Sequence, residues 1–200
     1  MKAMMKPLFV AMIACLGFVL AIGAEQSKKE AKKKEPAGPV VNGLQLSLSA
    51  DKTETIISKD GKTEKPIALK LTFTNVSDKP IKFNAYDFNW SRTKGAVKAL
   101  PADAVTVQLA AADRILPPPK ADDFLEIKPG QTWSPNLKPS FPGTFPQGVG
   151  TIAFYQVAKP GEFRIRFTYN SAKIDSPLAE GIWIGELVSN EIVINVNEAK

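Results

Sequence analysis

Three residues able to carry chemistry, Asp122, Asp123 and Glu126, form the densest acidic group in this sequence. Paired carboxylates act as general acid and base in many enzymes, and they also bind oxygen-preferring cations such as calcium. The spacing of these three residues does not match a calcium-binding loop. We therefore expect them to be solvated residues at the start of a strand, with no catalytic or metal-binding role.

The sequence lacks the side chains on which most other protein chemistry depends. It contains no histidine, and its single cysteine (Cys15) and all four methionines lie close to the N-terminus. The rest of the chain therefore cannot build zinc, copper or haem sites from the usual ligands, nor use a histidine base or a cysteine nucleophile. Neither a phosphate-binding glycine loop nor a Gly-x-Ser-x-Gly motif occurs. We expect a protein that is not an enzyme and that has no cofactor.

Residues 1–24 have the layout of a cleaved signal peptide. Two lysines precede an apolar run over residues 8–22, and small residues follow it. Cleavage after Gly23 or after Ala24 fits the small residues equally. The apolar run is shorter than a comfortable membrane span needs. We expect the protein to be secreted or periplasmic.

A second interpretation of the N-terminus depends on Cys15. The sequence "MIAC" at residues 12–15 resembles a bacterial lipoprotein box, in which the cysteine carries the lipid. The apolar run continues beyond Cys15, whereas a lipoprotein turns polar there. Lipid anchoring at Cys15 stays the minority alternative. Contact with a membrane is expected only through an uncleaved or lipidated N-terminus.

Residues 25–39 predict a disordered, lysine-rich tether. They contain no aromatic or large aliphatic residue, so they cannot bury enough surface to offset the entropy of ordering. The net charge of +6 is spread over the chain, because the first 24 residues, residues 25–40 and residues 41–200 each contribute about a third of it. A basic footprint on the folded part is not evident, and we expect no nucleic-acid partner.

From residue 40 onward the apolar residues recur with period two, which is typical of half-buried strands. Five runs carry the pattern: residues 44–48, 67–73, 105–109, 163–169 and 192–196. Turn sequences rich in Gly, Pro and Asp separate them, and only residues 109–115 approach a helical period, enough for one short turn. We predict an all-β fold, an antiparallel immunoglobulin-like β-sandwich of eight or nine strands over residues 40–198.

Several residues are candidates for contact with a partner. Arg164 and Arg166 alternate with apolar residues in "PGEFRIRFTY", where ordinary cross-strand ion pairing is the favoured interpretation. Residues 134–150 predict a long irregular loop, which is often functional. Together with the "LPPPK" segment at 116–120 it is the expected contact site. The candidate side chains are Trp133, Phe141, Phe145, Trp183, Arg164 and Arg166; Trp90 is expected in the core.

Four segments also suggest a family. "IALKLTFTNVSDKPIKF", "DFLEIKPGQTW", "PGEFRIRFTY" and "WIGELVSNEIVINV" resemble secreted bacterial immunoglobulin-like domains, with a distant similarity to the BsuPI-type proteinase inhibitor domain. The resemblance covers residues 44–196. It implies an exported, non-enzymatic binding or structural module of the bacterial cell envelope, with a protein or glycan of the envelope as partner. The alternative that it implies is a proteinase inhibitor.

Overall fold

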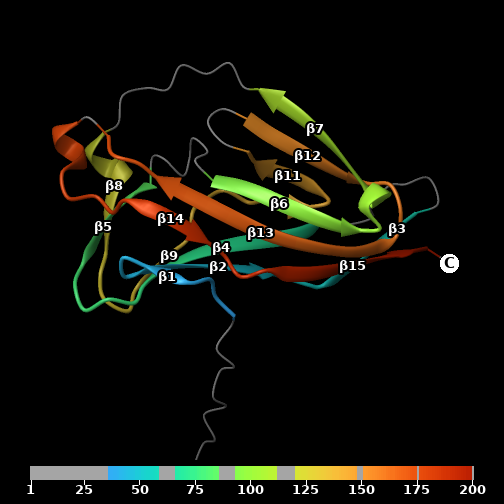
Figure 1. The fold of residues 1–200 in the computed structure, drawn as a ribbon, viewed down its shortest axis with the longest axis horizontal. Coiled ribbons are helices and arrows are strands. Elements are labelled where there is room, and N and C mark those ends of the chain that lie inside the picture. Colours follow the sequence, from blue (N-terminus) through green and yellow to red (C-terminus); the bar gives the residue numbers. More distant parts are fainter. Residues whose placement is uncertain are drawn as a thin grey trace, which may run out of the picture. The chain divides into compact units, whose positions relative to one another are not determined.

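The computed structural model describes residues 36–58, 66–85, 93–111, 120–147, 151–174 and 176–199, which lie in one compact unit, Glu35–Lys200. The predicted signal peptide, Cys15, most of the predicted tether, Trp90 and nearly all of the "LPPPK" segment lie outside these residues. The described chain is all-β, as predicted, with strands joined by turns and short 3₁₀ helices (Figure 1). No helix among the described residues has the length and apolar character that crossing a membrane requires.

Three larger sheets and one strand pair make up the fold (Figure 1). The first sheet has the order β1 (Val40–Val41), β2 (Leu44–Ala50), β4 (Ile67–Asn75), β10 (Ser140–Phe141), and β9 (Thr132–Trp133) also pairs with β4. The second has the order β14 (Gly185–Val188), β13 (Gly161–Ser171), β15 (Ile192–Glu198), β3 (Glu54–Ile57), and β6 (Thr93–Leu100) also pairs with β13. The third has the order β11 (Gly143–Pro146), β12 (Thr151–Val157), β7 (Val105–Ala111), and the remaining pair is β5 (Ile81–Asn84) with β8 (Phe124–Ile127).

All pairings between these strands are antiparallel except that of β15 with β3, which is parallel. Three 3₁₀ helices lie between strands, η1 (Ala102–Ala104), η2 (Ala121–Asp123) and η3 (Pro177–Ala179). The described residues contain fifteen strand segments, more than the eight or nine expected, because several segments of two to four residues carry too short a pattern to recognise in the sequence.

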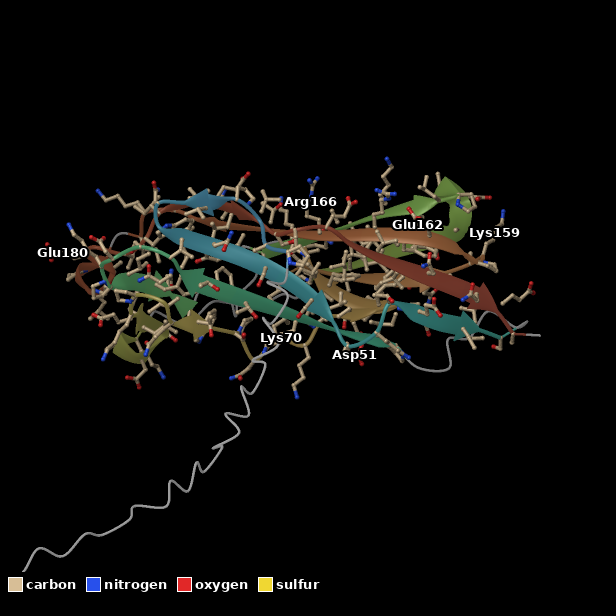
Figure 2. All side chains as sticks on the ribbon, turned by 90° about the horizontal axis from the view of Figure 1, so that it is seen from below. Asp51, Lys70, Lys159, Glu162, Arg166 and Glu180 are labelled. Carbon is tan, nitrogen blue, oxygen red and sulfur yellow. The ribbon has the colours of Figure 1, made fainter. Side chains whose placement is uncertain are left out.

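The hydrophobic core lies between the first and second sheets, which makes the fold a β-sandwich. Apolar residues alternate with polar ones along β2, β4 and β13, and the apolar rows face one another. The rings of Phe73 on β4 and Tyr169 on β13 are 5.3 Å apart in an edge-to-face arrangement. Figure 2 shows Lys70 of β4 and Arg166 of β13 on opposite sides of the sandwich.

The segment "PGEFRIRFTY" is a central strand, as its alternation predicted. Strand β13 pairs with β6 along one edge and with β14 and β15 along the other. Its four inward side chains, those of Phe163, Ile165, Phe167 and Tyr169, are fully buried. Only the outward residues of β13, which lie between these four, are therefore available to contact a partner.

The prediction of a long irregular loop over residues 134–150 was wrong over residues 140–146, which form β10 and β11 and carry the buried Phe141 and Phe145. Residues 134–139 contain no strand, and residues 148–150 lie outside the described residues. Phe141 packs 5.0 Å from the ring of Phe163, and Phe145 packs 5.3 Å from that of Phe167. These two short strands could not be recognised in the sequence, because prolines and glycines interrupt the segment and leave no run of period two that is long enough.

Two boundaries also differ from the predictions. Gly38, placed in the predicted tether, is buried, and its backbone N–H donates to the carbonyl of Leu46 at 2.9 Å. The folded part therefore begins before residue 40. Leu109 lies in β7, which continues as a strand through Ala111, so the helical turn suggested for residues 109–115 does not begin there.

Candidate partner-binding surface

The third sheet contains no charged residue. Strands β7, β11 and β12 have seven, four and seven residues, and none is Asp, Glu, Lys or Arg. In the whole chain, 23% of residues are charged, so a sheet without charge is a departure from its composition. Charged side chains normally keep exposed sheet surfaces from binding other chains. This sheet lacks that protection.

One face of this sheet joins the core. Ala153 on β12 pairs with Phe145 on β11, and both are buried; Tyr155 is the next inward residue on β12. The ring of Phe145 lies 4.8 Å from that of Tyr155. Gln147, just beyond β11, donates from its side-chain amide to the Tyr155 hydroxyl at 3.2 Å. Burial raises the pKa of the Tyr155 phenol, so this hydroxyl stays neutral.

The same face becomes exposed at β7. Leu109 pairs with Ala153, and Val107 pairs with Tyr155, so both point toward the core side of the sheet. Leu109 is nevertheless 68% exposed and Val107 46% exposed, whereas their partners are buried. The core side of the sheet is thus covered along β12 and uncovered along β7.

The opposite face of the sheet presents apolar side chains to solvent. Ile152 and Phe154 point outward from β12, and they are 41% and 40% exposed. Their neighbours across the sheet on β7 are Ala110 and Gln108. We call the exposed side chains of Val107, Leu109, Ile152 and Phe154, together with the free edge of β7, the β7–β12 surface.

Strand β7 also ends its sheet. Among the described residues it pairs with β12 and with no other strand, and Figure 1 shows it at the outer margin of the sheet. Most strands that end the other two large sheets have only two to four residues; the exception is β6, which has eight and carries Lys94 and Lys98. A strand at a sheet end leaves backbone N–H and C=O groups free to pair with another chain. The nearest described ion pair, between Asp103 and Lys159, lies at one end of β7 and β12.

The four aromatic candidates from the sequence lie elsewhere, and most are buried. Phe141 and Phe145 are fully buried in the core, so they do not contact a partner in this conformation. Trp183 is also buried: it stacks on Tyr169, and its indole N–H donates to the carbonyl of Val41 at 3.2 Å. Trp133 is half-buried on β9, with its ring 5.1 Å from that of Phe83.

The two arginine candidates lie on the outer face of β13. Arg164 binds the carboxylates of Glu162 at 2.8 Å and Glu191 at 3.3 Å, and these ion pairs raise the pKa of its guanidinium. This is the ordinary pairing that the sequence favoured. Arg166 is exposed, and it faces away from the core (Figure 2). The structure does not bring the six candidates together into one surface.

Two other regions of the described chain, the acidic group and a cleft beside η3, make weaker candidate sites than the β7–β12 surface. Among the described residues, no three His, Cys, Asp or Glu side chains gather where a metal ion could bind. In the acidic group, the Asp123 carboxylate accepts from the backbone N–H of Lys120 at 2.7 Å and so caps η2. A cleft of about 550 Å³ beside η3 is lined partly by Lys173, Glu180 and Ile184, but it buries no unpartnered polar group.

No protein-family model matches this chain, and no curated protein matches it either.

The sequence contained a signal for this surface that the alternation pattern did not show. The alternation predicted correctly that Val107 and Leu109 lie on one face of a strand. Whether that face is covered depends on residues far away in the sequence, so periodicity cannot reveal it. The absence of charge from both "VTVQLAA" and "TIAFYQV" is visible in the sequence, and it would have singled out these strands.

Proposed function

We propose that this protein is an exported, non-enzymatic binding or structural module of the bacterial cell envelope, and that it contacts its partner through the β7–β12 surface. The uncharged third sheet, apolar on its exposed face and open at its edge, is the observation that carries this proposal. Export is supported by the signal-peptide layout of residues 1–24. The envelope as location follows from the resemblance to secreted bacterial immunoglobulin-like domains.

Leaving the apolar side chains of the β7–β12 surface in water is unfavourable in free energy, and binding a partner removes them from water. Burying an apolar side chain gains about 1.5–3 kcal/mol relative to leaving it exposed, and four such side chains lie on two neighbouring strands. A partner also gains backbone hydrogen bonds from the edge of β7. Two of these side chains lie on each face of the sheet. A partner strand at the edge of β7 therefore has apolar surface beside it on both faces, and exposed apolar patches mark protein–protein contact sites.

Site-specific photocrosslinking in the native cells tests the proposal. The full chain carries p-benzoylphenylalanine in place of Phe154, and a matched chain carries it in place of Ile184, which is 46% exposed far from this surface. We expect one dominant crosslinked species from position 154, a protein or a glycan identified by mass spectrometry, and none from position 184. Equal labelling from both positions, or none from either, would refute the proposed surface.

The proteinase inhibitor suggested by the resemblance is the alternative function. It predicts that the protein abolishes the activity of a proteinase when the two are mixed in equal amounts. In the crosslinking experiment it predicts a proteinase as the captured species. The location is tested by the N-terminal residue of the protein recovered from the envelope, which cleavage after Gly23 or Ala24 makes Ala24 or Glu25.

A further inference from the structure

We infer that the edge of β7 pairs with β7 of a second copy of this chain, antiparallel about a two-fold axis at Gln108. The two third sheets would then form one continuous sheet of six strands. This inference rests on the proposed use of the β7–β12 surface for binding, and it names the occupant of the edge.

The register of this pairing follows from the length of the strand. With Gln108 on the axis, all seven residues of β7 find a partner: Val105 opposite Ala111, Thr106 opposite Ala110, and Val107 opposite Leu109. Opposite residues in an antiparallel pair lie on the same face. Each copy therefore covers the exposed Leu109 of the other with Val107, on the side of the sheet where the core is open.

The chemistry of the strand favours a second copy over an unrelated strand. A symmetric interface places the edge against the same edge, so a charge at the centre of the strand would lie close to its own copy. Strand β7 contains no charge and no proline, and its inward row is entirely apolar. It is thus complementary to itself. Of the strands that end the second sheet, β3 and β14 have four residues each and carry Glu54 and Glu186, and β6 has eight residues and carries Lys94 and Lys98.

The outward face also allows self-pairing. Thr106, Gln108 and Ala110 point outward from β7, and all three are exposed. In the paired sheet, Gln108 meets its own copy, and amide side chains both donate and accept hydrogen bonds. Ile152 and Phe154 of both copies then lie on one enlarged outer face, one strand away from the junction on each side.

Disulfide trapping tests the register. In a Cys15→Ala background the introduced thiol is the only one in the chain. Gln108→Cys places two thiols at the axis, within the short distance that a disulfide requires. Thr106→Cys places them four residues apart along the paired strands, about 13 Å, which is too far. We expect oxidised dimers from Gln108→Cys and not from Thr106→Cys, and dimers again when Thr106→Cys and Ala110→Cys chains are mixed.

Sedimentation velocity tests the pairing without a new thiol. We expect the unaltered full chain to form dimers in a concentration-dependent way. Val107→Lys should raise the dimer dissociation constant by about tenfold or more, because it buries an unpaired ammonium group against leucine. Ile184→Lys is the matched control, since Ile184 and Val107 are equally exposed at 46%, and it should leave the dimer unchanged. Circular dichroism confirms that both variants are folded.

The outcomes separate the two proposals. A chain that stays monomeric at its highest soluble concentration, or Thr106→Cys trapping as efficient as that of Gln108→Cys, overturns the self-pairing. If position 154 still crosslinks to an envelope component in that case, the proposed function survives without a second copy. A trapped dimer with no envelope component at position 154 supports the self-pairing and overturns the envelope partner.

Discussion

At the scale of single residues, Asn75 organises the turn after β4 with its buried side-chain amide. Its Nδ2 donates to the carbonyls of Lys79 and Ile127, both at 2.7 Å. Its Oδ1 accepts from the backbone N–H of Ser77 at 2.9 Å and from the Ser77 hydroxyl at 2.7 Å. Asn75 directly precedes "VSDKP" (residues 76–80), one of the turn sequences containing Pro and Asp, and turn composition alone does not reveal the role of the residue before it. One residue thus joins three parts of the chain.

Asn75→Ala should lower the free energy of unfolding by about 1–3 kcal/mol, because it leaves the buried carbonyl of Ile127 without its donor. Urea denaturation measures the change. Ser77→Ala removes only a hydroxyl, whose bonds lie in a partly exposed region, and it should cost less. A larger loss from Ser77→Ala than from Asn75→Ala would contradict the central role of the amide.

A second prediction at this scale concerns Asp103, which lies at one end of the third sheet. Hydrogen bonding and charge from Lys159 lower the pKa of the Asp103 carboxyl. A carboxyl with a lowered pKa in the folded state stabilises the fold above its unfolded pKa, and this contribution is lost as pH falls through the folded value. The pair is exposed, so we expect little effect on stability.

An NMR titration of the Asp103 carboxyl should give a pKa below that of an ordinary aspartate. In Lys159→Ala the pKa of the Asp103 carboxyl should return toward the ordinary value. An unchanged pKa for Asp103 in this variant would contradict the ion pair.

At the scale of elements, the long alternating strands were predictable and the short connecting strands were not. Strands β2, β4, β13 and β15 each show several apolar residues at period two, and each was placed correctly. Strands β10 and β11 are held by long-range pairing with β4 and β12, which no local pattern reports. The exposure of β7 in the candidate site could not be predicted either, because it depends on which distant segments pack beside β7 and not on the sequence of β7 itself.

Gly143, the first residue of β11, provides a prediction about how β10 and β11 are connected. It has φ of 149°, and a Cβ at this position would overlap the hydroxyl of Ser140 and approach its carbonyl oxygen at 2.9 Å. Gly130, in the turn before β9, has φ of 72° but nothing within 4 Å of such a Cβ. Both require glycine conformations, and only Gly143 is also crowded.

Gly143→Ala should therefore cost about 3 kcal/mol of unfolding free energy, and Gly130→Ala about 1–2 kcal/mol. Thermal or urea denaturation of the two variants measures the difference. Because Gly143 lies in the same short strand as the buried Phe145, Gly143→Ala should also loosen the third sheet, seen as faster amide exchange in β12. Equal losses from the two variants would show that Ser140 moves aside without cost.

At the scale of the whole molecule, the sequence predicts a folded part that begins at residue 40, after a lysine-rich tether. In the structure the folded part begins earlier, by residue 38. Gly38 is fixed from three directions: it is bonded to Leu46, its carbonyl accepts from the side chain of Gln45 at 2.7 Å, and a Cβ on it would overlap the carbonyl of Val188. All five lysines of the predicted tether lie before this anchor, the last being Lys34. Among the described residues, folding therefore protects the chain from about residue 38 onward.

Brief digestion with trypsin should release a stable fragment that begins at Glu35, because a protease needs several residues of unpaired chain and the predicted tether buries no apolar surface. Mass spectrometry of the fragment identifies its first residue. Digestion in urea is the control, since unfolding should make the lysines of β4 and β6 equally susceptible. If the native protein is instead cut within residues 66–85 or 93–111 before it is cut after Lys34, the anchor at Gly38 does not mark the start of the stable fold.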